Sequence, residues 1–209
     1  MTENLKREVR NPFICILHPF DQFYELRHYG GGSALYVALI LIAWFLAAVM
    51  QRQNTGYIFN YNNTADLNIL IILAKTAGLF VLWTVGNWTV SIFSGGIGHF
   101  WDIVYTSAYC LIPFIFFQLV STALSNVLTI NEGGFVNYAV MIGIIWSSGL
   151  MWIGLRQIHD QEFLQTLIYM ILTVLVMAVI FFLIVLFYTL ISQLVIFLQT
   201  VYKEILFRI

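Results

Sequence analysis

Five long apolar runs alternate with short polar stretches along the chain, and they restrict its possible folds more than any other feature. About 20 helical residues cross a hydrocarbon core about 30 Å thick, and each run is close to that length. Only 9% of the residues are charged, whereas a soluble domain carries about 25%. We therefore predict an all-α integral membrane protein whose five transmembrane helices cover residues 33–50, 67–88, 101–124, 135–154 and 164–187.

The segment before the first span predicts an interfacial amphipathic helix. Pro19 suits a first helical turn, and an apolar face formed by Phe20, Phe23 and Tyr24 lies opposite a polar one. The segment is too short and too polar to span a bilayer, so we expect it to lie in the membrane interface. Residues 1–32 then form a cytoplasmic tail with this helix, and residues 33–187 form the five-span membrane domain.

The last apolar run has no turn signal after Leu164, so it cannot be a hairpin of two spans. From Tyr188 onward polar residues gather on one half of a helical wheel: Thr189, Ser192, Gln193, Thr200, Lys203 and Arg208. We predict that residues 188–209 form an amphipathic helix extending past the bilayer. Either one straight rod of about 65 Å from Leu164 or a span followed by a surface helix fits this pattern.

The distribution of Lys and Arg predicts the orientation in the cell membrane. One side of a five-span topology would carry Lys6, Arg7, Arg10, Arg27 and Arg156, and the other Arg52, Lys203 and Arg208. Because basic residues favour the cytoplasmic side, the N-terminus is expected inside and the C-terminus outside.

Residues 86–113 contain no Lys or Arg but many Gly, Ser, Thr and aromatic residues. This composition predicts a short turn at the membrane face that leads directly into the third span. The turn has no Lys and follows no strand, so it does not match a phosphate-binding loop. We identify it as the best candidate for a partner-contact surface, carried by Asn87, Trp88, Gly96, Gly98, His99, Trp101 and Asp102.

Three intramembrane residues are candidates for function, namely Lys75, Pro113 and Gln118. Lys75 either contacts an ion or substrate or extends its ammonium to the interface, with Asp66 and Glu132 as possible partners. Pro113 predicts a kink in the third span. Small residues in the fourth span allow close helix packing, within the chain or against another: Gly143, Ser147 and Gly149.

No pair of residues matches a nucleophile with a base, and no histidine or cysteine spacing matches a metal site. We therefore expect no enzyme activity, no cofactor and no metal. The net charge of -1 excludes the basic field that nucleic-acid binding requires. Cys110 fits a small buried thiol, whereas Cys15, near the membrane face, is a candidate for acylation.

Three stretches resemble the Yip-one (Ypt/Rab-interacting protein) domain family in its bacterial branch: HPFDQFYELRHYGGGS, GNWTVSIFSGGIGHFWDI and AYCLIPFIFFQLVSTALSNVLTINEG. The positions that carry the resemblance are Pro19, Phe20, Phe23, Arg27, Asn87, Trp88, Val90, Gly96, Gly98, Ala108, Tyr109 and Pro113. The resemblance implies a five-span helical domain with a cytoplasmic N-terminus.

Eukaryotic members of that family work with small GTPases in vesicle traffic. The long acidic arm that they carry is absent from this sequence, so we do not expect GTPase binding. Some bacterial members resemble accessory subunits of ABC-type export or envelope-protection systems. The resemblance therefore implies a non-enzymatic scaffold or accessory subunit with a membrane-protein partner or a second copy. The alternative is a small-solute or ion transporter or channel that acts as an oligomer.

Overall fold

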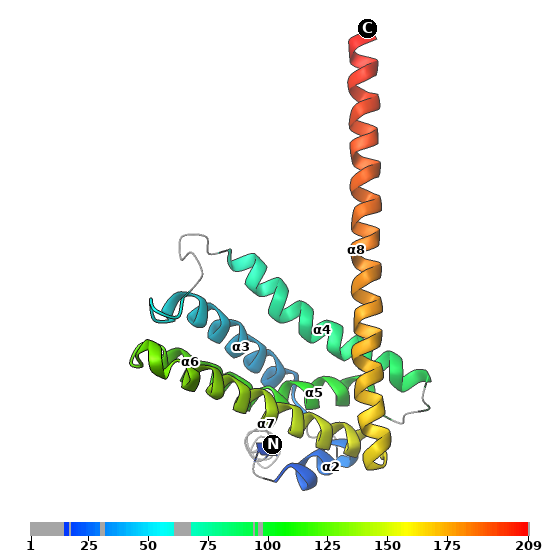
Figure 1. Cartoon of the computed structure of the whole chain (residues 1–209). Helices are drawn as coiled ribbons and strands as arrows, with labels where there is room; N and C mark the ends of the chain where they lie inside the picture. Colours follow the sequence, from blue (N-terminus) through cyan, green and yellow to red (C-terminus); the bar gives the residue numbers. More distant parts are fainter. Residues whose placement is uncertain are drawn as a thin grey trace.

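The computed structural model describes residues 15–16, 18–29, 32–60, 68–93, 95 and 98–208, and its regular structure there is entirely helical (Figure 1). Its helices are α2 (Pro19–Tyr29), α3 (Ala34–Asn54), α4 (Ile69–Phe93), α5 (Phe100–Cys110), α6 (Ile112–Leu124), α7 (Gly134–His159) and α8 (Phe163–Arg208). The short 3₁₀ helix η2 (Ile130–Glu132) precedes α7. Within these residues five helical segments are long and apolar enough to cross a membrane, which confirms the predicted fold class.

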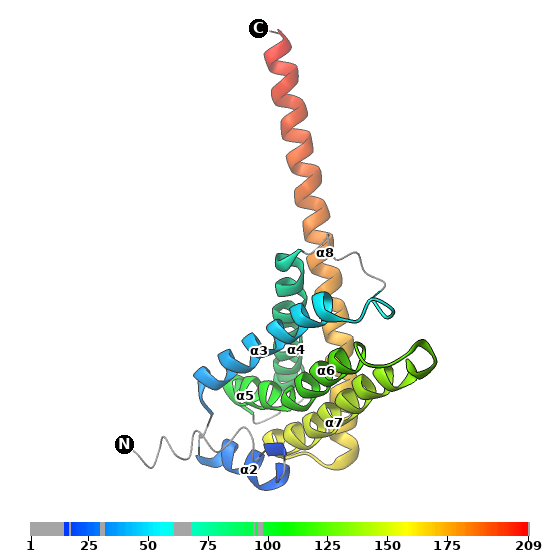
Figure 2. The same ribbon diagram turned by 90° about the vertical axis from the view of Figure 1, so that its left-hand side faces the viewer.

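Successive spans are connected at alternate ends of the bundle. At one end α2 packs on α7, where Arg27 Nη1 donates to the backbone carbonyl of Gln157 at 3.0 Å. At the other end the segment after α3 meets the end of α6, where the backbone N–H of Gly56 donates to Ser125 Oγ at 2.9 Å. We call these the α2 end and the opposite end; in Figure 2 the α6–α7 turn lies well away from α2.

The α2 helix covers the bundle with one face and exposes the other. Phe23 and Leu26 are fully buried, whereas Phe20 and Tyr24 are half exposed. Of the expected apolar face, Phe23 therefore packs on the bundle, whereas Phe20 and Tyr24 face outward. The cause is that Leu26, one helical turn after Phe23, joins it in contact with the bundle.

The second span continues five residues beyond its predicted end, and α4 stops only at Phe93. The composition of residues 86–113 predicts a turn from Gly86 onward, but in the structure this glycine lies within α4. A Cβ atom there would lie 3.0 Å from Met177 Cγ and 3.4 Å from the Thr173 carbonyl oxygen of α8. Gly86 therefore allows α8 to approach α4 closely rather than ending the helix.

The third span is broken near Pro113 into α5 and α6. Leu111 lies between them at φ -77° and ψ -17°, and Pro113 occupies the first turn of α6. In a continuous helix the N–H of Phe114 would donate to its own helix. Here it donates to Ser147 Oγ of α7 at 3.0 Å, so the break leaves this amide paired.

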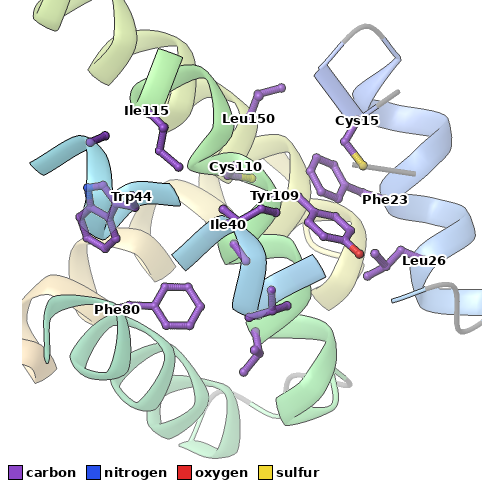
Figure 3. Close-up of a cluster of buried hydrophobic side chains, with 14 residues drawn as sticks. Cys15, Phe23, Leu26, Ile40, Trp44, Phe80, Tyr109, Cys110, Ile115 and Leu150 are labelled. Carbon is purple, nitrogen blue, oxygen red and sulfur yellow. The ribbon is translucent and has the colours of Figure 1, made fainter. Parts of the chain in front are cut away.

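Around this break lies the apolar core, in which Tyr109, Cys110 and Ile115 meet Ile40 and Trp44 of α3 (Figure 3). Further side chains of the same cluster come from α2, α4 and α7: Phe23, Leu26, Phe80 and Leu150. Cys15 is only 1% exposed, and burial raises the pKa of its thiol to about 12. A protonated, covered thiol is a poor acylation target, so this structure does not favour acylation at Cys15.

The last helix is one uninterrupted rod of 46 residues, so α8 shows no change of secondary structure near residue 187. Its first part packs on α4 and α7, and Thr173 is fully buried there. Residues 181–204, which we call the projecting segment, lie beyond these contacts and are exposed except for Ser192, which is partly covered. Figures 1 and 2 show this segment extending away from the other helices.

Two glycines of α7 provide a matched test of packing between α6 and α7. A Cβ atom at Gly143 would lie 2.8 Å from Phe117 Cβ and 3.4 Å from Phe114 Cα, whereas Gly149 has nothing within 4 Å. We predict that Gly143→Ala lowers stability by about 1–3 kcal/mol through overpacking. Gly149→Ala should leave it unchanged. The midpoint of thermal unfolding in detergent checks this, and equal midpoints for the two variants would contradict it.

Candidate functional site

The structure disperses the residues predicted to form a partner-contact surface. Asn87 is 0% exposed inside the bundle, and Asp102 is largely covered, whereas Trp88 and Trp101 are 42% and 58% exposed. Gly98 packs against the ring of His159, to which a Cβ atom would come within 2.9 Å. His99 is exposed, and Gly96 lies outside the described residues. Only part of the predicted set therefore faces outward.

Asn87 belongs instead to a buried polar cluster at the α2 end. Tyr169 Oη of α8 donates to the backbone carbonyl of Asn87 at 2.8 Å, and His159 Nε2 of α7 lies 3.5 Å from Asn87 Oδ1. The rings of His159 and Tyr169 are 4.6 Å apart. Asn87, His159 and Tyr169 thus connect α4, α7 and α8 where α8 begins.

This cluster was not predicted, because the composition of residues 86–113 places Asn87 in a turn. Apolar residues recur after Asn87, at Trp88, Val90, Ile92 and Phe93, and this signal allows a longer helix without deciding between that helix and a turn. The cluster contains no nucleophile, so its chemistry is structural: it fixes the start of α8 against the bundle.

Four aromatic residues of α4 and α5 form a connected row beside the α4–α5 turn, with Trp88 and Trp101 exposed and Phe100 and Tyr105 partly buried. Ring centroids lie 5.6 Å apart for Trp88 and Phe100, 5.9 Å for Phe100 and Trp101, and 6.1 Å for Trp101 and Tyr105. The turn is closed by a capping box, in which the His99 backbone N–H donates to Asp102 Oδ2 at 3.3 Å. Such a row has the composition of the aromatic belts that anchor proteins at membrane interfaces.

The intramembrane polar candidates lie toward the opposite end. Lys75 is exposed on α4 and lines a polar cleft of about 810 Å³, whereas Gln118 is 5% exposed. Gln118 Nε2 donates to Gln51 Oε1 at 2.7 Å. Glu132 accepts hydrogen bonds from the backbone N–H and hydroxyl of Thr129, both at 3.1 Å. Asp66, the other partner considered for Lys75, lies outside the described residues.

A separate apolar cavity of about 440 Å³ lies beside the Pro113 break, between α3, α4, α7 and α8. Leu111 and Phe114 flank the break and line the cavity, together with Trp44 and Trp83. Trp83 Nε1 donates to Ser107 Oγ at 3.1 Å, so the indole N–H has a hydrogen-bond partner there. The remaining lining is mostly apolar and sulfur-rich, with Ser147 and Ser148 as its other polar residues, and such a lining suits a hydrocarbon chain.

The projecting segment is a long surface in the described residues that no other element of the chain covers. Three of its hydroxyls are satisfied by its own helix: Thr189, Ser192 and Thr200 donate to the carbonyls of Leu186, Tyr188 and Ile196. The side chain of Gln193 has no hydrogen-bond partner among the described residues. An unpaired amide on an apolar helix is a group that a second helix can satisfy.

These features define a multi-pass membrane protein of five helical spans with a long final helix. The Yip1 domain family model matches residues 14–199, and the chain belongs to that family. The family consists of non-catalytic membrane proteins. Comparisons with curated proteins and with solved structures find no significant match. The family resemblance is thereby confirmed, whereas the assignment of this chain to the bacterial branch of the family stays a proposal.

Ser147 has a testable role at the Pro113 break. Ser147→Ala removes the acceptor of the Phe114 N–H, and leaving a buried donor unpaired costs about 1–3 kcal/mol. We predict a lower midpoint of thermal unfolding in detergent. Ser148→Ala is the matched control, because Ser148 is exposed and makes no such bond in the described residues. A Ser147→Ala midpoint equal to that of the parent chain would refute this role.

The buried cluster predicts a smaller effect for the Tyr169 hydroxyl. Tyr169→Phe removes one buried hydrogen bond worth about 1 kcal/mol, which corresponds to about 2–4 °C in the unfolding midpoint for a chain of this size. Tyr188→Phe on the same helix is the control, because Tyr188 is 71% exposed. Indistinguishable shifts for the two variants would show that the hydroxyl of Tyr169 contributes nothing to the cluster.

Proposed function

We propose that this Yip1 domain protein is a non-enzymatic membrane scaffold that binds a helix of another membrane protein along its projecting segment. The observation that carries the proposal is the length of α8. Its 46 residues make a rod of roughly 69 Å, about twice the thickness of a bilayer core. The bundle contacts only the first part of that rod, so most of its apolar surface requires another cover.

The side chains of the projecting segment support a protein as that cover. Its polar residues share one face, with Thr189, Gln193 and Thr200 spaced at four and seven residues. Leu190, Leu194, Leu198 and Val201 lie on the other half of the helix, and all are exposed. A neighbouring helix can pair the Gln193 amide and pack on the hydroxyl-bearing positions, which lipid acyl chains cannot do.

The resemblance to bacterial family members supports a finer proposal about the partner. The partner would be a subunit of an ABC-type transporter or envelope-protection system in the bacterial inner membrane. The N-terminus and the aromatic row of Trp88 and Trp101 would be cytoplasmic, with the C-terminus outside, as the Lys and Arg distribution predicts. The proposed parts are a tail with α2 (1–32), the span domain (33–187) and the docking helix (188–209).

A transporter or channel is less well supported by the placement of polar groups. Lys75 and Gln118 lie toward the opposite end, beside the polar cleft. Between that cleft and the α2 end the core consists of large apolar side chains such as Trp44, Phe80 and Ile115. A single chain therefore provides no continuous polar path among its described residues.

Photocrosslinking in native membranes tests the scaffold proposal. A photoreactive residue replaces Ile196, which lies on the side of the helix that carries Gln193 and Thr200, in one variant and Leu198 on the opposite side in another. Because the partner helix is expected to pair the polar face, we expect a discrete adduct with one integral membrane protein from position 196 and far less from 198. Mass spectrometry of the adduct identifies the protein.

A further variant tests whether the polar face is needed to bind the crosslinked partner. The double change Gln193→Leu and Thr200→Leu should reduce co-purification of the identified partner at least tenfold, because the amide and one hydroxyl are lost. The unfolding midpoint of the bundle should be unchanged. An adduct of two 24.0 kDa chains would identify a second copy as the occupant and contradict the proposed partner. The absence of a discrete protein adduct would contradict docking altogether.

A further inference from the structure

The polar cleft at the opposite end is lined by two cations that no acidic group among the described residues balances. Arg52 of α3 and Lys75 of α4 both face this volume of about 810 Å³. Its lining in the described part of the chain includes no Asp or Glu, and neither side chain forms an ion pair there. Two uncompensated cations within one cleft favour an anion.

The hydroxyls of the cleft do not change this preference, because each is already engaged as a donor. Thr76, Thr122 and Ser125 donate to the backbone carbonyls of Ile72, Gln118 and Thr122, at 3.0, 3.0 and 2.7 Å. Ser121 Oγ donates across to the carbonyl of Val136 on α7 at 3.0 Å. These bonds stabilise the walls of the cleft. The hydroxyls therefore have no free donor for a ligand, and the other side chains of the lining determine what binds.

The free hydrogen-bonding capacity that remains is mainly that of donors. Gln51 lines the cleft, and because its Oε1 accepts from Gln118 Nε2, its amide NH₂ remains available. Asn137, also in the lining, has no partner among the described residues. A guanidinium, an ammonium and two amides are the donor set that binds phosphate oxygens.

The rest of the lining indicates a ligand with an apolar part. Ile72, Val136 and Val140 contribute apolar surface, and they belong to helices that span the membrane. A free inorganic anion would use the cations and leave these side chains without a partner. A phospholipid uses both, since its phosphate can reach Arg52 and Lys75 while its acyl chains run along α4 and α7.

We propose that the cleft lined by Arg52 and Lys75 binds the phosphate headgroup of an anionic phospholipid. This site is distinct from the projecting segment, and it does not depend on the proposed scaffold function. It also gives Lys75 a role that needs no passage of solute through the bundle: the ammonium lies where a helix end meets the headgroup layer and pairs with lipid phosphate.

Native mass spectrometry of the full chain in detergent tests this site with phosphatidylglycerol and phosphatidylcholine as probes at equal concentrations. We expect more phosphatidylglycerol than phosphatidylcholine on the parent protein. Arg52→Gln combined with Lys75→Gln should weaken the apparent affinity for phosphatidylglycerol about tenfold or more, since charged hydrogen bonds are lost. Lys203→Gln, which removes a cation from the projecting segment, should leave it unchanged.

Other outcomes would overturn the proposal. Equal binding of the two lipids would show that no selective site exists in the cleft. So would an equal loss of affinity for phosphatidylglycerol in the double variant and in Lys203→Gln. The midpoint of thermal unfolding, measured with and without inorganic phosphate, distinguishes a soluble anion from a lipid. If inorganic phosphate stabilises the parent but not the double variant, and phosphatidylglycerol is not preferred, the cleft binds a soluble anion and the lipid assignment is wrong.

Discussion

Inside a bilayer no water pairs with backbone N–H and C=O groups, and each helix of this protein depends on meeting that requirement internally. The requirement is most demanding at Pro113, where the third span breaks and the Phe114 N–H loses its place in a continuous helix. Ser147 of α7 accepts that N–H at 3.0 Å. The break is therefore possible only where α7 already lies against α6, so the kink and the packing of the two helices are coupled.

That packing in turn depends on how closely helices can approach without side chains between them. Gly143 meets Phe117 of α6, and Gly86 meets Met177 of α8. In a membrane the hydrophobic effect does not favour helix–helix contact over helix–lipid contact, because lipid tails are as apolar as the side chains. Close packing and paired polar groups therefore decide which helix surfaces associate. Both kinds of contact occur together here: Gly86 and the Asn87–Tyr169 bond lie next to each other where α4 crosses α8.

These contacts explain which features the sequence could reveal. The five spans and the long final helix were predictable because apolar length alone determines them. The end of α4 was not, since a glycine such as Gly86 favours either a turn or a close helix contact, and only the position of α8 decides between them. Asn87 was assigned to a surface for the same reason. Its burial follows from contact with α8, whose Tyr169 lies 82 residues later in the chain.

The small residues of α7 illustrate the same limit within one helix. Gly143, Ser147 and Gly149 share a composition typical of packing surfaces, but only the first two meet α6, and Gly149 faces open space. The polar residues divide in a comparable way. At the α2 end Asn87, His159 and Tyr169 lie inside the bundle, whereas at the opposite end Arg52 and Lys75 have no acidic partner in the described part of the chain. Charges at that end need the membrane or a ligand to balance them, so binding is expected there. At the α2 end the polar groups bond partly to one another, and Asn87 Nδ2 and His159 Nδ1 have no partner among the described residues.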